Sequence, residues 1–493
     1  MQTKLNLIAE IARRDDRCKI NNVTYLLNEA NLKECFFMLK EGKATGIDGI
    51  GIEEYGRTLD KNLKDLVARM KRQAYHPQPV RRAYIPKANG KLRPLGIPST
   101  EDKIVQMGIA RILEAIYEGD FLDFSYGFRP SRNCHQAIER LNTVIMTKPI
   151  NHVIDADIKG FFENVDHAWM LKFLGHRISD PNLLRLIARF LKNGYMEEGK
   201  FNASDKGTPQ GGIVSPILAN IYLHYALDLW VERVVKPRCR GVVEIVRYAD
   251  DFVICVQYKN EAERILEALK RRLLKFNLEL AADKTRIIEF GRYAGTNAKK
   301  RGEKPATFNF LGFTHYVDRT RKGFFKLGRK TDRKKMVTKL KEMNLWLKSV
   351  RTTPIQEWWP VLKAKLLGHF RYYGVSGNSR SIGAYYRLTI RMVFKWINRR
   401  SQKHSMNWSA FSEYLKLHEL PKQRLYHNLY TLYGAIEVNT VEEPCAGNSQ
   451  ARFRESCAFV QLQYRDTTGD ASTRNHQFKD AAEVLIACNV ASC

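Results

Sequence analysis

The spacing of apolar residues changes several times along the chain and predicts both strands and helices. Short β-rich runs lie at 152–158, 242–247, 252–257 and 278–290, and residues 81–98 have the pattern of a hairpin with a turn at 88–90. Helical periodicity predicts helices at 31–40, 55–75, 102–117, 134–147, 216–235 and 261–276. A further pair of strands is expected at 299–313, and the pattern is helical from residue 331 onward. We therefore expect an α/β region followed by a helical one.

The net charge is the strongest bulk property of the chain. Its 493 residues carry a formal charge of +30, and 44% of them are apolar, so we expect a folded protein with a polyanionic partner. Nucleic acid and an anionic membrane both fit such a charge. However, no apolar run approaches the roughly 18 residues that span a bilayer, and the first residues lack the pattern of a signal peptide. We expect a cytoplasmic protein that binds nucleic acid and no membrane.

The cysteines argue against a zinc site. There are nine, widely scattered, and no two of them form a Cys-x-x-Cys pair. An odd, scattered set favours neither a structural zinc site nor a disulfide framework. We therefore expect no zinc and no zinc-supported nuclease domain.

The composition changes near residue 436. The last 58 residues contain five Lys/Arg and eight Asp/Glu, a net charge of −3, so residues 1–435 carry +33. We expect the nucleic-acid partner to bind the basic part, and the acidic tail has no predicted function.

Two adjacent carboxylates, Asp250 and Asp251, follow Tyr248 and Ala249 at the tip of the hairpin predicted for 242–257. Like charges this close raise each other's pKa unless a cation lies between them. Asp oxygens suit Mg²⁺, which recruits substrate phosphates as further ligands. The pair therefore indicates phosphoryl transfer, although a solvated acidic turn explains these four residues equally well when they are taken alone.

A third carboxylate lies at the end of the strand predicted for 152–158. Asp157 precedes Asp250 by 93 residues, and Asp155 competes with it from the same face of the strand. A two-metal site needs carboxylates from separate strands at one sheet edge, with the metals about 3.5–4 Å apart. We prefer Asp157 because it borders the pair Phe161-Phe162.

Six motifs in one order resemble the core motifs of reverse transcriptases. They are Arg93-Pro-Leu-Gly-Ile-Pro, Tyr126-Gly-Phe-Arg-Pro-Ser-Arg, Asp157-Ile-Lys-Gly-Phe-Phe, Gly207-Thr-Pro-Gln-Gly-Gly with its apolar continuation, Tyr248-Ala-Asp-Asp and Phe310-Leu-Gly-Phe. Upstream, Tyr25-Leu-Leu-Asn-Glu-Ala and Gly46-Ile-Asp-Gly resemble the N-terminal extension of intron-type enzymes, and 358–401 resembles a maturase domain. The set is similar to group II intron-encoded reverse transcriptases, also called maturases, of the compact type that lacks an endonuclease domain.

The resemblance implies a role for each matching residue in the palm. It places two Mg²⁺ ions on the catalytic residues Asp157, Asp250 and Asp251, with Ile158 in the same metal site. Phe161 would be the steric gate that excludes a 2′-OH, with Phe162 as its rival. Tyr248 would pack beneath the primer end, and the primer grip would consist of Phe310, Leu311 and Gly312.

Five further residues match positions that would contact the incoming nucleotide: Arg81, Lys87, Arg93, Gln210 and Lys284. The cations would neutralise the triphosphate, since catalysis of this kind consists largely of positioning and charge neutralisation. Lys284 occupies the place of a possible general acid for pyrophosphate. For each cation alone, an exposed position without function is the simpler explanation.

The fold implied by the resemblance is an α/β right-hand polymerase with fingers and an antiparallel palm sheet, followed by an α-helical thumb or maturase domain. We expect an N-terminal extension and the start of the fingers at 1–80, fingers and palm at 81–315, the thumb at 316–435 and the acidic tail at 436–493. Residues 319–341 hold eleven Lys/Arg and one acid, next to a helical region rich in Trp and Tyr. Cations track phosphates and exposed rings stack on bases, so this half is expected to bind RNA.

The implied function is an RNA-directed DNA polymerase that binds its group II intron RNA, assists its splicing and copies it into DNA. Its partners would be the intron RNA, an RNA template, a DNA primer and dNTPs, in the bacterial cytosol near the nucleoid. Two alternatives stay open: a defence-associated reverse transcriptase of the CRISPR-linked or abortive-infection type, and a non-catalytic RNA-splicing chaperone. The three Asp residues argue against the chaperone.

Overall fold

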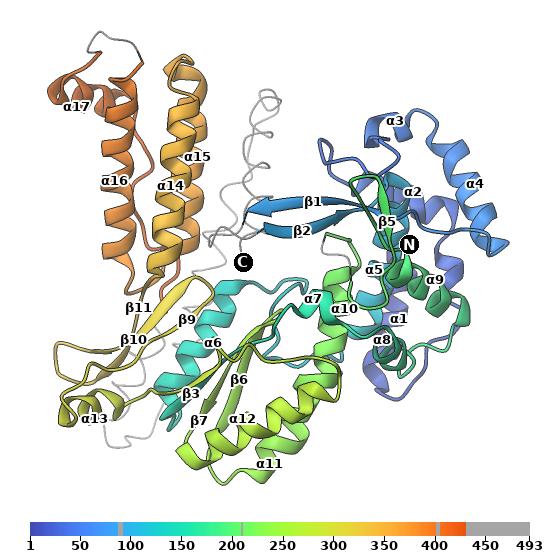
Figure 1. Cartoon of the computed structure of the whole chain (residues 1–493), viewed down its shortest axis with the longest axis horizontal. Helices are drawn as coiled ribbons and strands as arrows, with labels where there is room; N and C mark the ends of the chain where they lie inside the picture. Colours follow the sequence, from blue (N-terminus) through green and yellow to red (C-terminus); the bar gives the residue numbers. More distant parts are fainter. Residues whose placement is uncertain (87–91, 209–210, 401–404, 430–493) are drawn as a thin grey trace, which may run out of the picture. The chain divides into compact units, whose positions relative to one another are not determined.

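A computed structural model describes residues 1–86, 92–208, 211–400 and 405–429 (Figure 1). The chain forms two compact units. The first comprises Met1–Leu311 and His315–Gly328, and the second comprises Gly312–Thr314 and the chain from Arg329. Within the described ranges, no helix combines the length and apolar character needed to cross a bilayer.

The first unit begins with a helical layer. Its elements are α1 (Gln2–Arg14), η1 (Thr24–Leu26), α2 (Glu29–Phe37), α3 (Ile52–Gly56), α4 (Leu59–Lys71) and α5 (Thr100–Tyr117). In α4 the buried residues Leu59, Leu63, Leu66 and Val67 recur at helical spacing, so one face of the helix is apolar. Helix α5 is buried along most of its length and contacts α1 and α2. It is therefore the central helix of this layer.

The two paired strands of the hairpin predicted for 81–98 are confirmed, whereas its predicted turn at 88–90 lies outside the described residues. Strands β1 (Val80–Pro86) and β2 (Leu92–Ile97) are antiparallel, with Arg81 opposite Ile97. They belong to a four-stranded sheet in the order β2-β1-β4-β5, completed by β4 (Tyr195–Glu197) and β5 (Lys200–Asn202).

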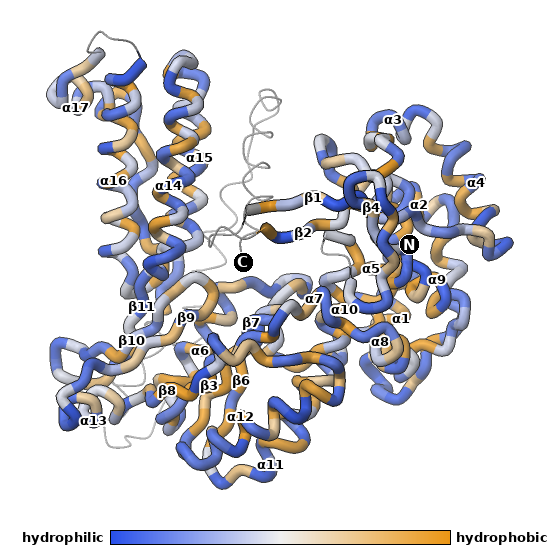
Figure 2. The backbone as a smooth tube through the Cα atoms, viewed as in Figure 1, coloured by the Kyte–Doolittle hydropathy of each residue, from blue (hydrophilic) through white to orange (hydrophobic). Residues whose placement is uncertain are grey.

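A second four-stranded sheet is antiparallel throughout and has the order β6-β7-β3-β8. Its strands are β3 (His152–Asp157), β6 (Val243–Tyr248), β7 (Asp251–Val256) and β8 (Arg286–Glu289). Every residue from Val243 to Arg247 is buried, so both faces of β6 are covered. Figure 2 shows the apolar character of these central strands. The sheet is accordingly a rigid platform for the residues at the ends of its strands.

Further helices precede, connect or follow the strands of this sheet along the chain. They are α6 (Cys134–Thr147), α7 (Phe161–Asn164), α8 (His167–Leu174), α9 (Pro181–Lys192), α10 (Ser215–Leu223), α11 (Lys236–Arg238), α12 (Lys259–Leu274) and α13 (Ala294–Lys300). The helix predicted for 216–235 is one continuous run from α10, but its course includes two π-helical segments, η2 (His224–Asp228) and η3 (Val231–Val235). Such segments are rare and frequently lie at functional sites.

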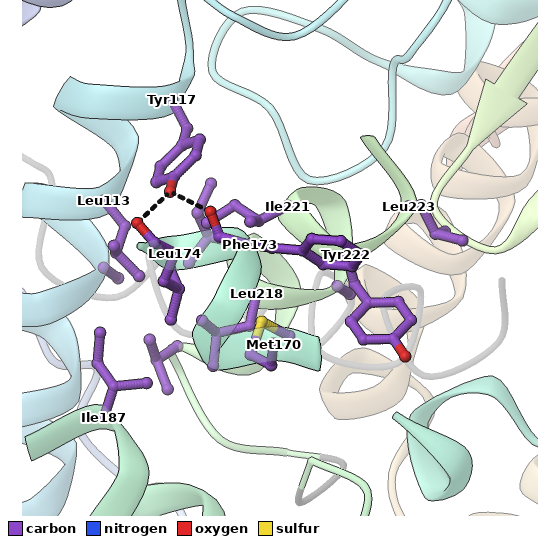
Figure 3. Packing of buried hydrophobic residues seen from close by; sticks show 14 of the residues in the cluster. Leu113, Tyr117, Met170, Phe173, Leu174, Ile187, Leu218, Ile221, Tyr222 and Leu223 are labelled. Atoms are coloured by element: carbon purple, nitrogen blue, oxygen red, sulfur yellow. Dashed lines mark hydrogen bonds between the residues drawn. The ribbon is translucent and has the colours of Figure 1, made fainter. Parts of the chain in front are cut away.

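The main core of the first unit draws on many of its helices and on the strands β3, β6 and β7. Figure 3 shows Leu113 and Tyr117 of α5 packing with residues of α8, α9 and α10. The buried Tyr117 hydroxyl donates to the carbonyl oxygens of Phe173 (3.3 Å) and Leu174 (3.1 Å). The C-terminal end of α8 is thereby tied to the centre of the apolar cluster.

Two predicted strand regions are wrong in part. Of the run 278–290, only Arg286–Glu289 is a strand, because the chain turns after Ala281: the backbone N–H of Ala281 donates to the Asp157 carbonyl, and that of Thr285 turns back to the Ala281 carbonyl. Of the pair expected at 299–313, the beginning is the end of α13, and only β9 (Phe308–Phe310) and the start of the next strand are extended.

The boundary between the units falls within a three-stranded sheet of order β11-β10-β9, in which β10 is Phe313–Arg319 and β11 is Phe325–Thr331. The helices of the second unit follow as α14 (Arg333–Ser349), α15 (Ile355–Tyr373), α16 (Ser379–Ile397) and α17 (Trp408–Leu417). Helix α16 contacts both α14 and α15. The prediction of a mixed α/β region followed by a helical one is thus confirmed.

We expect Phe173→Ala to lower the free energy of unfolding by about 3–5 kcal/mol, because it empties a site at the centre of the core. Phe173 is 4% exposed, and its ring centroid lies 5.3 Å from that of Tyr222 and 5.5 Å from that of Phe276. The control is Phe201→Ala, since Phe201 is 58% exposed. Urea unfolding monitored by circular dichroism would measure both, and equal effects would contradict the assignment of the core.

Candidate active site

Three aspartates from two strand ends meet at one end of the antiparallel sheet. Asp157, the last residue of β3, lies directly opposite Asp251, the first residue of β7, and Tyr248 of β6 lies opposite Asp251 on the other side. Asp250 occupies the turn between β6 and β7. Ala249 in the same turn has a left-handed backbone with φ +57°, which is unusual for a residue with a Cβ. Register and turn together bring the three carboxylates into one region.

The carboxylates carry more negative charge than their surroundings compensate. Burial, followed by the charges of Asp250, Asp155 and Asp157, raises the pKa of Asp251 to about 7. A backbone N–H from Leu311 opposes this rise by bonding the carboxylate. The pKa of Asp250 is also raised, chiefly by burial and further by Asp157. Carboxylates whose pKa is raised by burial and by neighbouring negative charges favour a bound cation.

The nearest protein cation is Lys284. Its ammonium Nζ lies 2.5 Å from Oδ2 of Asp157, and this hydrogen bond raises the pKa of the lysine. The turn that begins at Ala281 brings Lys284 to this place. In the part of the chain that the structure describes, no three His, Cys, Asp or Glu side chains are already gathered around one point as a metal centre. The carboxylate of Asp157 is instead directed to the lysine.

Asp155, the competing carboxylate, lies two residues further from the end of the sheet. It pairs across the strand with Val253 of β7, and its Oδ2 lies 3.6 Å from Nε of Arg286 on β8. Burial raises the pKa of Asp155, and Arg286 opposes the rise. Both aspartates thus have a cationic partner, and what distinguishes them is position: Asp157 lies opposite Asp251, whereas Asp155 lies opposite Val253.

The two arginines predicted to bind nucleotide lie in different environments. The charge of Arg93, on β2, lowers the pKa of Asp250, so its guanidinium is close enough to act on the carboxylates. Arg81 donates through Nε (3.0 Å) and Nη2 (2.8 Å) to the carbonyl of Thr45. These two hydrogen bonds connect Arg81 to the loop that precedes Gly46. Lys87, the third cation of the hairpin, lies outside the described residues.

The two candidate gate residues differ in exposure. Phe161 is 2% exposed and its ring packs edge-on against Tyr222, whereas Phe162 is only partly buried. The loop after Lys206 backs this segment, because the N–H of Thr208 donates to the Phe162 carbonyl at 2.7 Å. Gln210 of the same loop lies outside the described residues.

The remaining predicted residues are Ile158 and the segment Phe310–Gly312. Ile158 is 3% exposed and bridges Leu280, so its side chain is in the core and only its main chain could face a metal. Phe310 is buried, and Leu311 has a left-handed φ of +48° as its N–H meets Asp251. Gly312, with φ +77°, belongs to the second unit, where its carbonyl accepts from the N–H of Asp332.

Sequence reasoning missed a buried ion pair behind the turn. Arg247 of β6 and Asp228 of η2 are both fully buried, and Nε of the arginine donates to Oδ1 of the aspartate at 2.8 Å. A partial signal was present, because each residue is a charge inside a mainly apolar predicted element, although Glu244 shares the strand of Arg247, and Glu232 and Arg233 share the helix of Asp228. A charge in such a position must be paired, and two of opposite sign predict each other as partners.

Comparison with known proteins agrees with this geometry. Residues 85–315 match the family described as Reverse transcriptase (RNA-dependent DNA polymerase). The chain is 33% identical over 282 residues to the group II intron-encoded protein LtrA of Lactococcus lactis subsp. cremoris, a match that covers 55% of this chain and 47% of LtrA. It is 34% identical over 321 residues to Protein YkfC of Escherichia coli (strain K12), covering 58% of this chain and 84% of YkfC.

The chain belongs to the reverse transcriptase family, which confirms the resemblance drawn from the six motifs. Within the family it is related to LtrA, of whose length it spans about half. Among solved structures, a telomerase from Candida albicans in complex with a fragment of telomeric RNA has a TM-score of 0.42 at 13% identity, over 74% of this chain and 61% of that one. That similarity is too low to support an argument.

We expect the protein to lose stability as pH rises from about 4 to about 7 in the presence of a metal chelator. The Asp251 carboxyl keeps its proton to about pH 7 when folded but ionises near its ordinary pKa of 3.8 when unfolded, so the folded state binds more protons across this window. The stabilisation that comes from protonated Asp251 is fully present below pH 3.8 and is lost by about pH 7. Asp251→Asn should flatten the dependence.

Urea unfolding of both proteins at several pH values would measure this difference. Other buried carboxyls titrate in both proteins, and for this reason the comparison is between the two slopes. Identical slopes would contradict the raised pKa.

Proposed function

We propose that this protein is an RNA-directed DNA polymerase that binds its group II intron RNA, assists its splicing and copies it into DNA. The observation that carries the proposal is the meeting of Asp157, Asp250 and Asp251 at one end of an antiparallel sheet. Membership of the reverse transcriptase family and the relationship to LtrA support it. In this proposal the fold is a right-hand polymerase, with fingers and palm followed by a helical thumb.

The donor set fits divalent metal. The carboxylates are hard oxygen ligands, and the raised pKa values of Asp250 and Asp251 mark a shortage of positive charge. Asp157, Asp250 and Asp251 would hold two Mg²⁺ ions, with the main chain of Ile158 adjoining them. When bound, the ions would activate the attacking 3′-hydroxyl and neutralise the leaving pyrophosphate.

The other residues would bind and orient the substrates. Arg93 would neutralise the triphosphate, with Lys87 and Gln210 as further contacts. Phe162, being the more exposed ring of the pair, would meet the sugar, while Phe161 supports it from the core. Lys284, kept protonated by Asp157, would hold a proton within reach of the pyrophosphate.

The primer would lie against Tyr248 and the segment Phe310–Gly312, where Leu311 already holds Asp251 through its N–H. The domain boundaries are part of the same proposal. The extension and the start of the fingers would be 1–80, the fingers and palm 81–315, the thumb or maturase domain 316–435, and 436–493 an acidic tail.

Cations rather than rings would provide most of the RNA affinity in the second unit. Trp358, Trp359, Tyr385 and Trp396 are all buried, so these rings form the core and do not stack on bases. Helix α14 instead exposes Arg333, Lys334, Lys341 and Lys348. A row of exposed cations suits the phosphate backbone of an RNA.

We expect Asp250→Ala to abolish metal-dependent extension of a DNA primer on an RNA template, because it removes a carboxylate from the proposed metal site. The control is Asp60→Ala, which removes an exposed carboxylate whose ion pair with Lys33 contributes little. Extension assays with Mg²⁺, alongside a reaction with chelator, would measure both.

Full extension by the Asp250→Ala protein would contradict the proposal. If the unaltered protein promoted splicing of an intron RNA but extended no primer, the chaperone function would replace it. A polymerase that neither bound nor spliced intron RNA would favour the defence-associated alternative.

We expect RNA affinity to fall by about 10³- to 10⁵-fold between 50 and 200 mM salt, because each phosphate that binds a cation of the protein releases counterions. Fluorescence anisotropy of a labelled RNA would measure the slope. Replacing Lys334 and Lys341 with Gln should make the slope shallower by about one unit for each phosphate that is no longer neutralised. Arg at the same two positions keeps the charge and should keep the slope.

A further inference from the structure

The buried pair of Arg247 and Asp228 forms the centre of a hydrogen-bond network next to the turn between β6 and β7, which contains Ala249 and Asp250. The guanidinium meets the carboxylate with two N–H groups, one of which spans 2.8 Å to Oδ1. Both side chains are 0% exposed. The pair therefore joins β6 to the π-helical segment η2 without any contribution from solvent.

The same guanidinium also holds the turn itself. Its Nη1 donates to the carbonyl of Ala249 and to Oδ1 of Asn220, each at 3.0 Å. The Ala249 carbonyl belongs to the peptide that leads into Asp250. Asn220, fully buried on α10, donates in turn to the carbonyl of Gly127 at 2.7 Å.

The segment that contains Gly127 supports the turn from a second side. The N–H of Arg247 donates to the carbonyl of Phe124, and the N–H of Tyr126 donates to the carbonyl of Arg247, both at 2.9 Å. Gly127 approaches so closely that a Cβ there would lie 2.3 Å from the backbone nitrogen of Ala249. The left-handed conformation of Ala249 is therefore fixed by contacts on its carbonyl and on its nitrogen.

Stability alone does not account for this arrangement. Replacing a buried ion pair with apolar residues of similar volume is often neutral or stabilising, because the pair must first be desolvated. A left-handed backbone at a residue with a Cβ is likewise unfavourable and persists only where the surroundings impose it. Both features occur close to Asp250 in the chain, where a displacement would move a proposed metal ligand.

We propose that Arg247, Asp228 and Asn220 are positioning residues: they hold the turn at Ala249 so that Asp250 and Asp251 face Asp157 in the arrangement that binds divalent metal. The inference rests on the proposed function. It adds that the affinity of the site for metal is determined in part by a buried network that does not touch the metal.

The test uses the full chain and Mn²⁺ as the probe, with free Mn²⁺ followed by electron paramagnetic resonance. We expect Asp228→Asn to weaken Mn²⁺ binding by about 10- to 100-fold, the range found when groups that orient metal ligands are removed. Primer extension by this variant should show a lower kcat and a higher Mg²⁺ requirement, with little change in affinity for RNA.

The matched control is Asp120→Asn. Asp120 pairs with the buried Arg177 at 2.9 Å, and that arginine also donates to backbone carbonyls, including that of Ala12 at 2.6 Å. The control thus removes the same charge from a similar buried pair in the same unit. It should lower the melting temperature as Asp228→Asn does but leave Mn²⁺ affinity unchanged.

Arg247→Lys serves if Asp228→Asn does not fold, because lysine keeps the charge opposite Asp228 but cannot reach Asp228, Asn220 and Ala249 together. A folded Lys variant should bind Mn²⁺ more weakly than the unaltered protein. Adding Ala249→Gly, which removes the cost of the left-handed backbone, should then recover part of the affinity.

The outcomes distinguish the positioning role from the proposed function. Failure of the unaltered protein to bind Mn²⁺ would overturn the proposed function and this inference with it. Normal Mn²⁺ binding by a folded Asp228→Asn or Arg247→Lys protein would overturn only the positioning role. An equal decrease of Mn²⁺ affinity in Asp120→Asn would also overturn the positioning role, since the effect would then be one of general stability.

Discussion

Antiparallel pairing of β3 with β7 sets the carboxylate of Asp157 directly across from that of Asp251, and the adjoining turn adds Asp250. A one-residue slip in this register would turn every side chain of a strand to the opposite face, so the pairing is fixed by the apolar residues on both strands. The favourable packing of the sheet therefore offsets the repulsion between these like charges. Several groups around the carboxylates reduce that repulsion.

The compensation comes from groups on separate segments. Lys284 reaches Asp157 from the turn after Ala281, Arg93 acts on Asp250 from the hairpin of β1 and β2, and the Leu311 N–H bonds Asp251. These partners are partly exposed or belong to the backbone. Such groups can be exchanged for a metal or a triphosphate without leaving a buried charge unpaired, which is consistent with the proposed metal and nucleotide site.

Buried arginines have a different use in this molecule. Arg247 with Asp228 and Arg177 with Asp120 each join segments that are distant in sequence, and each arginine also satisfies backbone carbonyls. Arg81 has a related role, since it bonds the Thr45 carbonyl twice. The nucleotide-binding role predicted for Arg81 stays a prediction, and in this structure its guanidinium connects two segments of the chain. Side-chain type alone does not separate the two roles, because both require a planar donor with five N–H groups.

The sequence by itself determined the class of elements and the family, because periodicity and motif order are local and linear properties, and it predicted metal binding at Tyr248-Ala-Asp-Asp. It predicted the hairpin at 81–98 and the strand that ends in Asp157 for the same reason. Only the tertiary structure decided that Phe161 is buried while Phe162 is only partly buried, that the run 278–290 turns at Ala281, and that Arg247 bonds Asp228 next to the turn between β6 and β7. Each of these depends on which distant segments pack together, and the free energy of such contacts is not encoded in any single stretch of the chain.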